Sequence, residues 1–281
     1  MRQKDSWDKT FEELTFTDDY IFKLVMEQPE IFKAVLGLIL PEVEVEKLTS
    51  LETEKPFTVD YFFHGVRFDV LAKGREKFVD IEVQLLDTGE LGERAMYYLS
   101  LLVAQSLKKG MSYRHLGESC VVFFCKFDPF GKGLPVYSFS MACEENPALH
   151  LTKNARIIFF NAAVWDKCNN AQLALLLRYM MTGEVTGDVA HKIDTAVRAV
   201  KQNRTIKGGW GMFYERMIAE RNEGFDKGMA QGFDKGMAQG FDRGSRDTKI
   251  ATARSFLAMG LSAQQVAQGT GLPIDEVQQL L

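Results

Sequence analysis

The chain has only four cysteines, and their spacing is not that of a metal site. It contains no CxxC pair, and no histidine stands at zinc-binding spacing from a cysteine. Two of the cysteines lie in apolar runs such as VVFFC, which favours buried free thiols at Cys120, Cys125, Cys143 and Cys168. The histidines are scattered, and we interpret each as structural or exposed: His64, His115, His150 and His191.

Long apolar runs are missing as well. The sequence has no run of about 18 apolar residues, which is the length needed to span a membrane. The opening MRQKDSWDKTFEEL is charged where a secretory segment would be apolar. We therefore expect a cytoplasmic protein. The sequence also lacks a GxxxxGK[ST] phosphate loop, an HExxH zinc motif and a GxSxG nucleophile elbow.

An excess of positive charge is also lacking. The formal net charge is −4, so binding of nucleic acid would need a locally basic face. One candidate is the stretch 191–221, where seven Lys and Arg residues stand against three acidic ones. A solvated helix face explains this stretch equally well.

The residues that are present predict a mixed α/β core. With 46% hydrophobic residues in 281, the chain can bury a full core. Helical spacing predicts two helices within 15–43, where Thr17 or Asp18 would cap the first, and a long amphipathic helix over 89–109 that ends at Gly110. Residues 57–86 predict a three-stranded meander with turns at His64–Gly65 and at 73–76. Three further buried strands are predicted in ESCVVFFCKF, PVYSFSMAC and NARIIFFN, and helices follow over 169–220.

An octapeptide repeat marks the C-terminal part. GFDKGMAQ occurs at 224–231 and again at 232–239, and it restarts as GFDRG at 240. In a helix, its Phe and Met residues form a stripe at spacing four, which winds around the axis, and its glycines each cost about 1 kcal/mol relative to alanine. We expect a mobile linker or a helix that forms only against a partner, such as a second copy of the chain. Beyond it, 247–281 predicts a small helix-turn-helix-like unit that favours packing or self-association over DNA binding, because no Lys or Arg follows Arg254.

Two acidic residues within apolar runs form the candidate site. Asp69 lies in RFDVLAK, and Glu82 and Gln84 alternate with apolar residues in VDIEVQLL, so both lie on one strand face. Carboxylates on adjacent strands can converge to bind Mg²⁺, which prefers oxygen ligands and can activate water for phosphodiester hydrolysis. A half-exposed strand would show the same alternation without any chemistry.

The order of these segments resembles a known family. The Asp-hairpin-ExQ arrangement, preceded by DYIFKLVM and followed by ERAMYYLSLLVAQSLKKGMSY and GESCVVFFCKFDPF, is similar to the recombination-promoting nuclease and transposase family of the PD-(D/E)xK superfamily. The similarity covers roughly residues 15 to 165. It implies a restriction-endonuclease-like mixed central sheet flanked by helices and followed by a helical C-terminal extension. The expected segments are a nuclease-like core (1–165), a helical extension (166–221), the repeat linker or helix (222–246) and the helical tail (247–281).

The resemblance also implies roles for individual residues. Asp69, Glu82 and the carbonyl of Val83 would hold Mg²⁺, or Mn²⁺ in its place, and Gln84 would orient the attacking water. Asp19 matches an accessory acidic position, although a first-turn acid favoured by the helix dipole fits equally well. Arg94 and Tyr98 match positions that could face the phosphate, and a salt bridge from Arg94 to a core carboxylate is an equal alternative.

The sequence departs from the motif at two positions. No proline precedes Asp69, and Gln84 stands where the motif has lysine, so it cannot offset negative charge on the phosphate. The leading hypothesis is a metal-dependent DNA endonuclease of bacterial recombination, mobile-element biology or defence. The alternative is a catalytically silent DNA-binding or self-assembling module on the same fold, and the chain is expected to form a homo-oligomer, with the repeat tail as one route. Transposition ranks last, because no separate integrase-type acidic triad is recognisable.

Overall fold

Two short helices open the part of the chain that the computed structural model describes, which is residues 9–43, 48–57, 66–74 and 76–281. They are α1 (Asp19–Met26) and α2 (Pro29–Ile39), as predicted. Asp18 is the N-cap residue of α1, but its carboxylate accepts hydrogen bonds from the backbone N and the hydroxyl of Thr15 instead of capping the helix. Pro29 occupies the first turn of α2, where its missing N–H costs no helical hydrogen bond.

A six-stranded mixed sheet forms the centre of the core, in the order β1-β2-β3-β4-β6-β5. The strands are β1 (Leu48–Phe57), β2 (Val66–Gly74), β3 (Lys77–Gln84), β4 (Glu118–Cys125), β5 (Val136–Ser140) and β6 (Ala155–Asn161). The strands β1, β2 and β3 pair antiparallel, β3, β4 and β6 pair parallel, and β5 joins β6 antiparallel at the edge. The mixed α/β fold class and the strands β4, β5 and β6 are confirmed.

The strand β1 precedes the predicted first strand of the meander, whose residues 58–63 lie outside the described residues. The strand β1 begins at Leu48, nine residues before the predicted start at Phe57. Its sequence LTSLETEKPF is polar and charged because it pairs with β2 on one side only, at the edge of the sheet. The expected His64–Gly65 turn lies outside the described residues.

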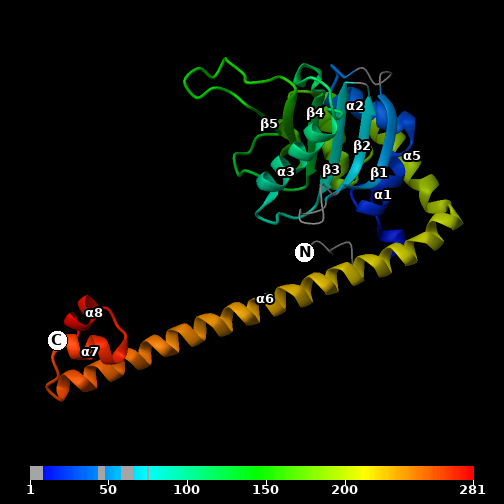
Figure 1. Ribbon diagram of the computed structural model, residues 1–281. Coiled ribbons are helices and arrows are strands. Elements are labelled where there is room, and N and C mark those ends of the chain that lie inside the picture. Colours follow the sequence, from blue (N-terminus) through cyan, green and yellow to red (C-terminus); the bar gives the residue numbers. More distant parts are fainter. Residues whose placement is uncertain (1–8, 44–47, 58–65, 75) are drawn as a thin grey trace. The chain divides into compact units, whose positions relative to one another are not determined.

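Helices cover both faces of the sheet (Figure 1). One face packs in a large apolar cluster with α1, α2, α4 (Ala171–Thr182) and α5 (Asp188–Gln202). The other face packs against α3 (Leu91–Gln105). The strand β3 shows the predicted alternation, because Val79, Ile81 and Val83 contact the first cluster whereas Phe78 belongs to the second.

The helix α3 ends four residues earlier than predicted. It stops at Gln105, and Ser106 is its C-cap. The Ser106 hydroxyl donates to the Val103 carbonyl and accepts a hydrogen bond from the Gly117 backbone N, which competes with continued helix. Gly110 still takes a positive φ of 85°, but in the following loop instead of at the helix end.

The C-terminal part is helical and belongs to a second compact unit, Tyr214–Leu281, distinct from Met1–Phe213. The helix α6 (Arg204–Ala258) contains the octapeptide repeats in one continuous helix, and α7 (Ala263–Thr270) and α8 (Ile274–Gln278) follow. A small cluster of Ala253, Val266, Leu272 and Val277 joins the last three helices. Gly271 ends α7 in the left-handed region, with φ of 68°.

The expectation for cysteine burial was only half right. Cys120 and Cys125 are buried, but Cys143 and Cys168 are half-buried, because they lie in the loops that follow β5 and β6. His115, His150 and His191 are exposed, as expected, and His64 lies outside the described residues. Within the described ranges, no helix combines the length and apolar character needed to cross a membrane.

Candidate active site

Asp69 and Glu82 converge where β2 and β3 separate. The ladder between these strands ends at the pair Val70 and Ile81. One step further, the backbone N of Asp69 donates to Oε1 of Glu82 at 2.8 Å, and the backbone N of Val83 donates to Oδ2 of Asp69 at 3.3 Å. Each carboxylate therefore takes a backbone hydrogen bond from the opposite strand, which holds the two side chains together.

The helix α1 brings a lysine to Asp69. The Nζ of Lys23 lies 3.3 Å from Oδ1 of Asp69 and 2.6 Å from Oδ1 of Asp19, one helical turn away. Lys23 is buried, with only 4% of its surface exposed, whereas the Asp19 side chain is 36% exposed. The accessory acid predicted at Asp19 thus lies at the site and contacts Asp69 through this lysine.

Burial raises the proton affinity of the carboxylates. Burial first, and then the negative charge of Asp19, raises the pKa of Asp69 to about 6. Burial and the charges of Asp69 and Asp80 raise the pKa of Glu82 well above its usual range. Asp80, two residues before Glu82 on the same strand face, is fully buried, and its pKa is raised by burial and by Asp69. Among the described residues, no permanent hydrogen-bond donor reaches its carboxylate oxygens, and an interaction with the Glu82 side chain offsets part of the rise in its pKa.

Gln84 is held by a cation from α3, which packs on the face of the sheet opposite α1. Its Oε1 accepts a hydrogen bond from the Arg94 guanidinium of α3, and its Nε2 donates to the Leu86 carbonyl at 2.6 Å. The Arg94 guanidinium lies over the rings of Tyr98 and Phe123, 5.8 and 5.3 Å from their centroids. Burial, followed by the charge of Glu82, raises the pKa of Tyr98. The structure thus brings Arg94 and Tyr98 to the site, where Arg94 hydrogen-bonds Gln84.

The charges at this site favour a divalent cation. Among the described residues, four carboxylates, those of Asp19, Asp69, Asp80 and Glu82, face two cations, Lys23 and Arg94. If all are ionised, a formal charge of −2 remains in a largely buried place, which is costly unless protons or a cation offset it.

The site offers few protein ligands for a metal ion. In the described part of the chain, no group of three or more His, Cys, Asp or Glu side chains is arranged to hold a metal ion. Two carboxylates and a backbone carbonyl suit Mg²⁺, which commonly keeps several waters beside one or two carboxylates. The oxygens of Asp80 beside Glu82, which no permanent donor among the described residues reaches, also fit a site whose negative charge is offset from outside the protein. The residues present therefore fit the implied metal.

Sequence reasoning missed two residues of this site. Lys23, four residues after Asp19, has the spacing of an ordinary surface ion pair, and only the buried residues around it in α1, Phe22 and Met26 among them, hinted otherwise. Asp80 continues the alternation of Glu82 and Gln84 toward the centre of β3, so period-two spacing could have found it.

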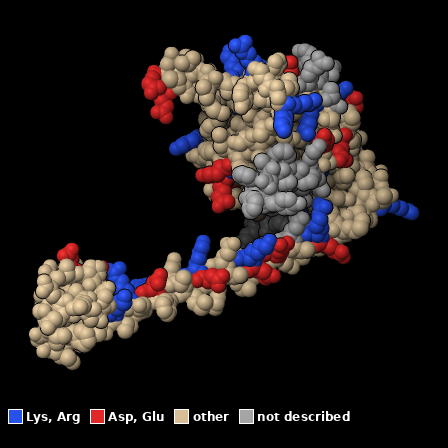
Figure 2. Space-filling model, viewed as in Figure 1, with Lys and Arg blue, Asp and Glu red and all other residues tan. Residues whose placement is uncertain are grey.

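Several cations of the basic stretch 191–221 have partners. Arg198 pairs with Asp194, Lys207 pairs with Glu12, and Lys201 donates to the Glu12 carbonyl. On the face of the molecule in Figure 2, basic and acidic side chains alternate along α6. This stretch therefore gives little support for a phosphate-binding surface.

Comparison with known proteins gave one match. The model of a family described as "PD-(D/E)XK nuclease family transposase" matches residues 16–181, which include every residue of the site from Asp19 to Tyr98. No curated protein and no solved structure matched the chain.

Proposed function

The chain belongs to the PD-(D/E)XK nuclease family of transposases, whose function is of the nuclease type, and we propose that it is a metal-dependent DNA endonuclease. Its reaction would be hydrolysis of phosphodiester bonds in recombination, mobile-element biology or defence. Such a role would place it in the bacterial cytoplasm.

The observation that carries this proposal is the convergence of Asp69 and Glu82 in a site with excess negative charge. These two carboxylates and the carbonyl of Val83 would hold Mg²⁺ or Mn²⁺. When bound, the ion would offset charge on the scissile phosphate and lower the pKa of an attacking water. The backbone hydrogen bonds to both carboxylates fix their positions, so they would need little rearrangement before binding.

Gln84 would orient the attacking water. The hydrogen bonds to Arg94 and Leu86 use one lone pair and one hydrogen of the amide, which has another of each. Arg94 would fix the amide and add positive charge beside it, with Tyr98 lining the phosphate side. Asp19 would act as an accessory acid through its contact with Lys23.

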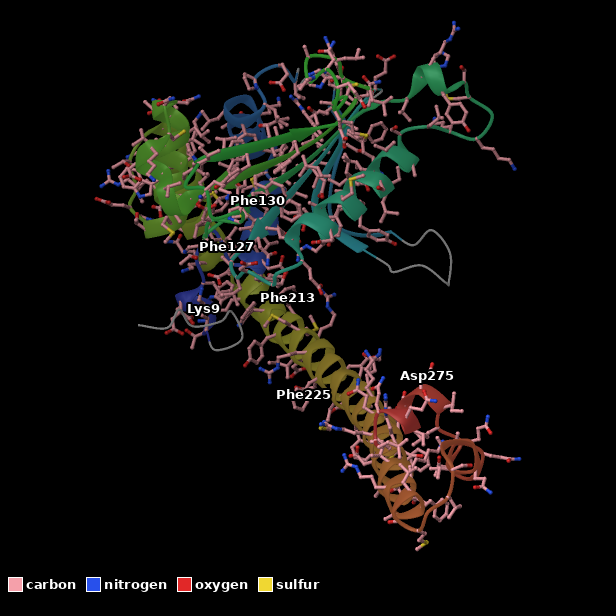
Figure 3. The ribbon with its side chains drawn as sticks, turned by 90° about the vertical axis from the view of Figure 1, so that its left-hand side faces the viewer. Lys9, Phe127, Phe130, Phe213, Phe225 and Asp275 are labelled. Atoms are coloured by element: carbon pink, nitrogen blue, oxygen red, sulfur yellow. The ribbon has the colours of Figure 1, made fainter. Side chains whose placement is uncertain are left out.

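The second candidate is a catalytically silent module that binds DNA or assembles on the same fold, and a feature of α6 favours assembly. Five large apolar side chains of the repeats are between 61% and 78% exposed: Phe225, Met229, Phe233, Met237 and Phe241. Figure 3 shows side chains projecting from α6 around Phe225. A contiguous exposed apolar stripe of this kind is typical of an interaction surface, and we propose self-association through it. This assembly is compatible with either candidate function.

Plasmid nicking tests the endonuclease. Purified protein is incubated with supercoiled DNA and Mg²⁺, Mn²⁺, Ca²⁺ or EDTA, beside the variants Glu82→Gln and Glu144→Gln. Gln retains the oxygen that accepts from the Asp69 backbone but removes the charge, and Glu144 is an exposed loop carboxylate that serves as the matched control. Nicking by wild type and Glu144→Gln, and not by Glu82→Gln, is the expected result. A folded wild type that nicks with none of the metals would favour the silent module.

A further inference from the structure

Lys23 is a buried lysine at the centre of the candidate site. Its ammonium contacts Asp19 and Asp69, and Asp69 is a proposed metal ligand. Lys23 is one of the buried residues of α1. Burying an ammonium group costs free energy unless it is ion-paired or serves a function, so lysines are among the residues least often buried.

An ion pair with Asp19 alone does not account for this burial. Asp19 is more than a third exposed, and a pair of this i,i+4 type forms readily on a helix surface without burying the lysine. Lys23 also contacts Asp69, which places the ammonium at the point where β2 and β3 separate. The position of Lys23 therefore brings its charge to the proposed metal ligand.

The site lacks a lysine at the end of the ExQ sequence, and its two cations are not equivalent. Arg94 is committed to Gln84 and lies over two aromatic rings, which fix its plane. Lys23 holds a compact charge on a flexible stem of four carbons, which can exchange one oxygen partner for another. Of the two, Lys23 is the cation that can move toward negative charge as that charge develops on the phosphate.

We propose that Lys23 is a catalytic residue of this site and supplies the positive charge that Gln84, being uncharged, cannot supply. This inference rests on the proposed endonuclease function. Lys23 would leave Asp69 to the divalent cation and place its ammonium against a non-bridging oxygen of the scissile phosphate. It would form and break no covalent bond. The water oxygen bonds to phosphorus as the bond from phosphorus to the leaving oxygen breaks; the water proton passes to solvent and the leaving oxygen gains one from solvent. Lys23 would offset the negative charge on the phosphate oxygens throughout.

The test compares cleavage with metal binding in the same variants. Lys23→Met removes the charge and keeps an unbranched apolar side chain, Lys23→Gln keeps hydrogen-bonding capacity, and Lys23→Met with Gln84→Lys returns a lysine at the end of the ExQ sequence. Plasmid nicking gives the rate, and calorimetric titration with Mn²⁺ in the absence of DNA gives the dissociation constant.

We expect Lys23→Met to reduce the nicking rate by roughly 100-fold or more, the usual effect of removing one group that stabilises developing charge. Its Mn²⁺ dissociation constant should stay equal or fall, because a cation that competes for Asp69 is gone. The double variant should regain at least part of the lost rate. An ion pair that only supports the fold predicts the opposite, with Mn²⁺ binding lost together with cleavage.

Nicking by Lys23→Met and Lys23→Gln at the wild-type rate would overturn this role and leave the endonuclease standing. A parallel loss of Mn²⁺ binding, or failure of both variants to fold, would make Lys23 a structural ion-pair partner. Absence of nicking by the folded wild type would overturn both proposals.

Discussion

Glu82→Gln should make the metal-free protein more stable while it abolishes cleavage. The backbone N of Asp69 donates to Oε1 of Glu82, and the amide oxygen of Gln can accept the same hydrogen bond. The amide NH₂ replaces the second carboxylate oxygen beside Asp80, whose carboxyl group interacts with the side chain of Glu82. The substitution therefore removes a charge that repels Asp69 and Asp80 and gives Asp80 a permanent donor, whereas Glu82 can donate to it only when protonated.

The size of the expected gain in the free energy of unfolding follows from the new hydrogen bond to Asp80. A hydrogen bond to a charged group contributes about 1.5–3 kcal/mol, so the free energy of unfolding in EDTA at pH 7 should rise by about that amount. Mg²⁺ should reduce or remove this difference in the free energy of unfolding. A cation at 100 times its dissociation constant adds about 2.7 kcal/mol to the wild type and less to the variant, which has lost one ligand charge.

Urea unfolding followed by circular dichroism measures both effects, in EDTA and in Mg²⁺. Glu144→Gln, an exposed substitution, should stay within about 0.5 kcal/mol of wild type in either buffer. A Glu82→Gln protein that is less stable than wild type in EDTA would refute the reasoning. It would show that the charge of Glu82 stabilises the fold through ion pairs and is not held there for a cation.

Two further predictions concern pH and assembly. The pKa of Asp69 is about 6 in the folded chain against its usual 3.8, so between these values the folded state holds a proton that the unfolded state has released. The contribution of this group to the free energy of unfolding in EDTA should therefore rise as pH falls from 7 to 4, by up to about 3 kcal/mol; equal pH slopes in wild type and Asp69→Ala by urea unfolding would contradict this. Replacing Phe225, Phe233 and Phe241 with Gln should lower the sedimentation-derived mass of the full chain and leave nicking per chain unchanged, since these side chains are exposed; a wild type that already sediments as a monomer would contradict self-association through α6.

The sheet interior was predictable from sequence because buried parallel strands are continuous apolar runs. The strands β4 and β6 were found in this way, each with neighbours on both sides. The edge strand β1 was not predicted from Leu48 to Pro56, because pairing on one side lets it keep a charged sequence. The end of α3 was misjudged for a local reason, since the hydrogen bonds of Ser106 outweighed four residues of favourable helical spacing.

The acidic residues of the site and Arg94 could be proposed from sequence, whereas Lys23 and the contacts of both cations could not. Alternation on β3 puts Glu82 and Gln84 on one face, and a hairpin brings Asp69 near. The contact between Lys23 and Asp69 joins residues 46 positions apart through the packing of α1 against β2, which period-based reasoning cannot reach. The hydrogen bond from Arg94 to Gln84 was not predicted for the same reason, because it depends on how α3 packs next to β3.

The repeats within α6 also bear on how this protein can change over generations. Two identical neighbouring octapeptides, in a helix that stays unbroken through them, are units that a gene can gain or lose without disturbing either end of the protein. Each unit of eight residues would lengthen the helix by about 12 Å and turn its far end by about 80°. Copy number would therefore change the length of α6 in fixed steps.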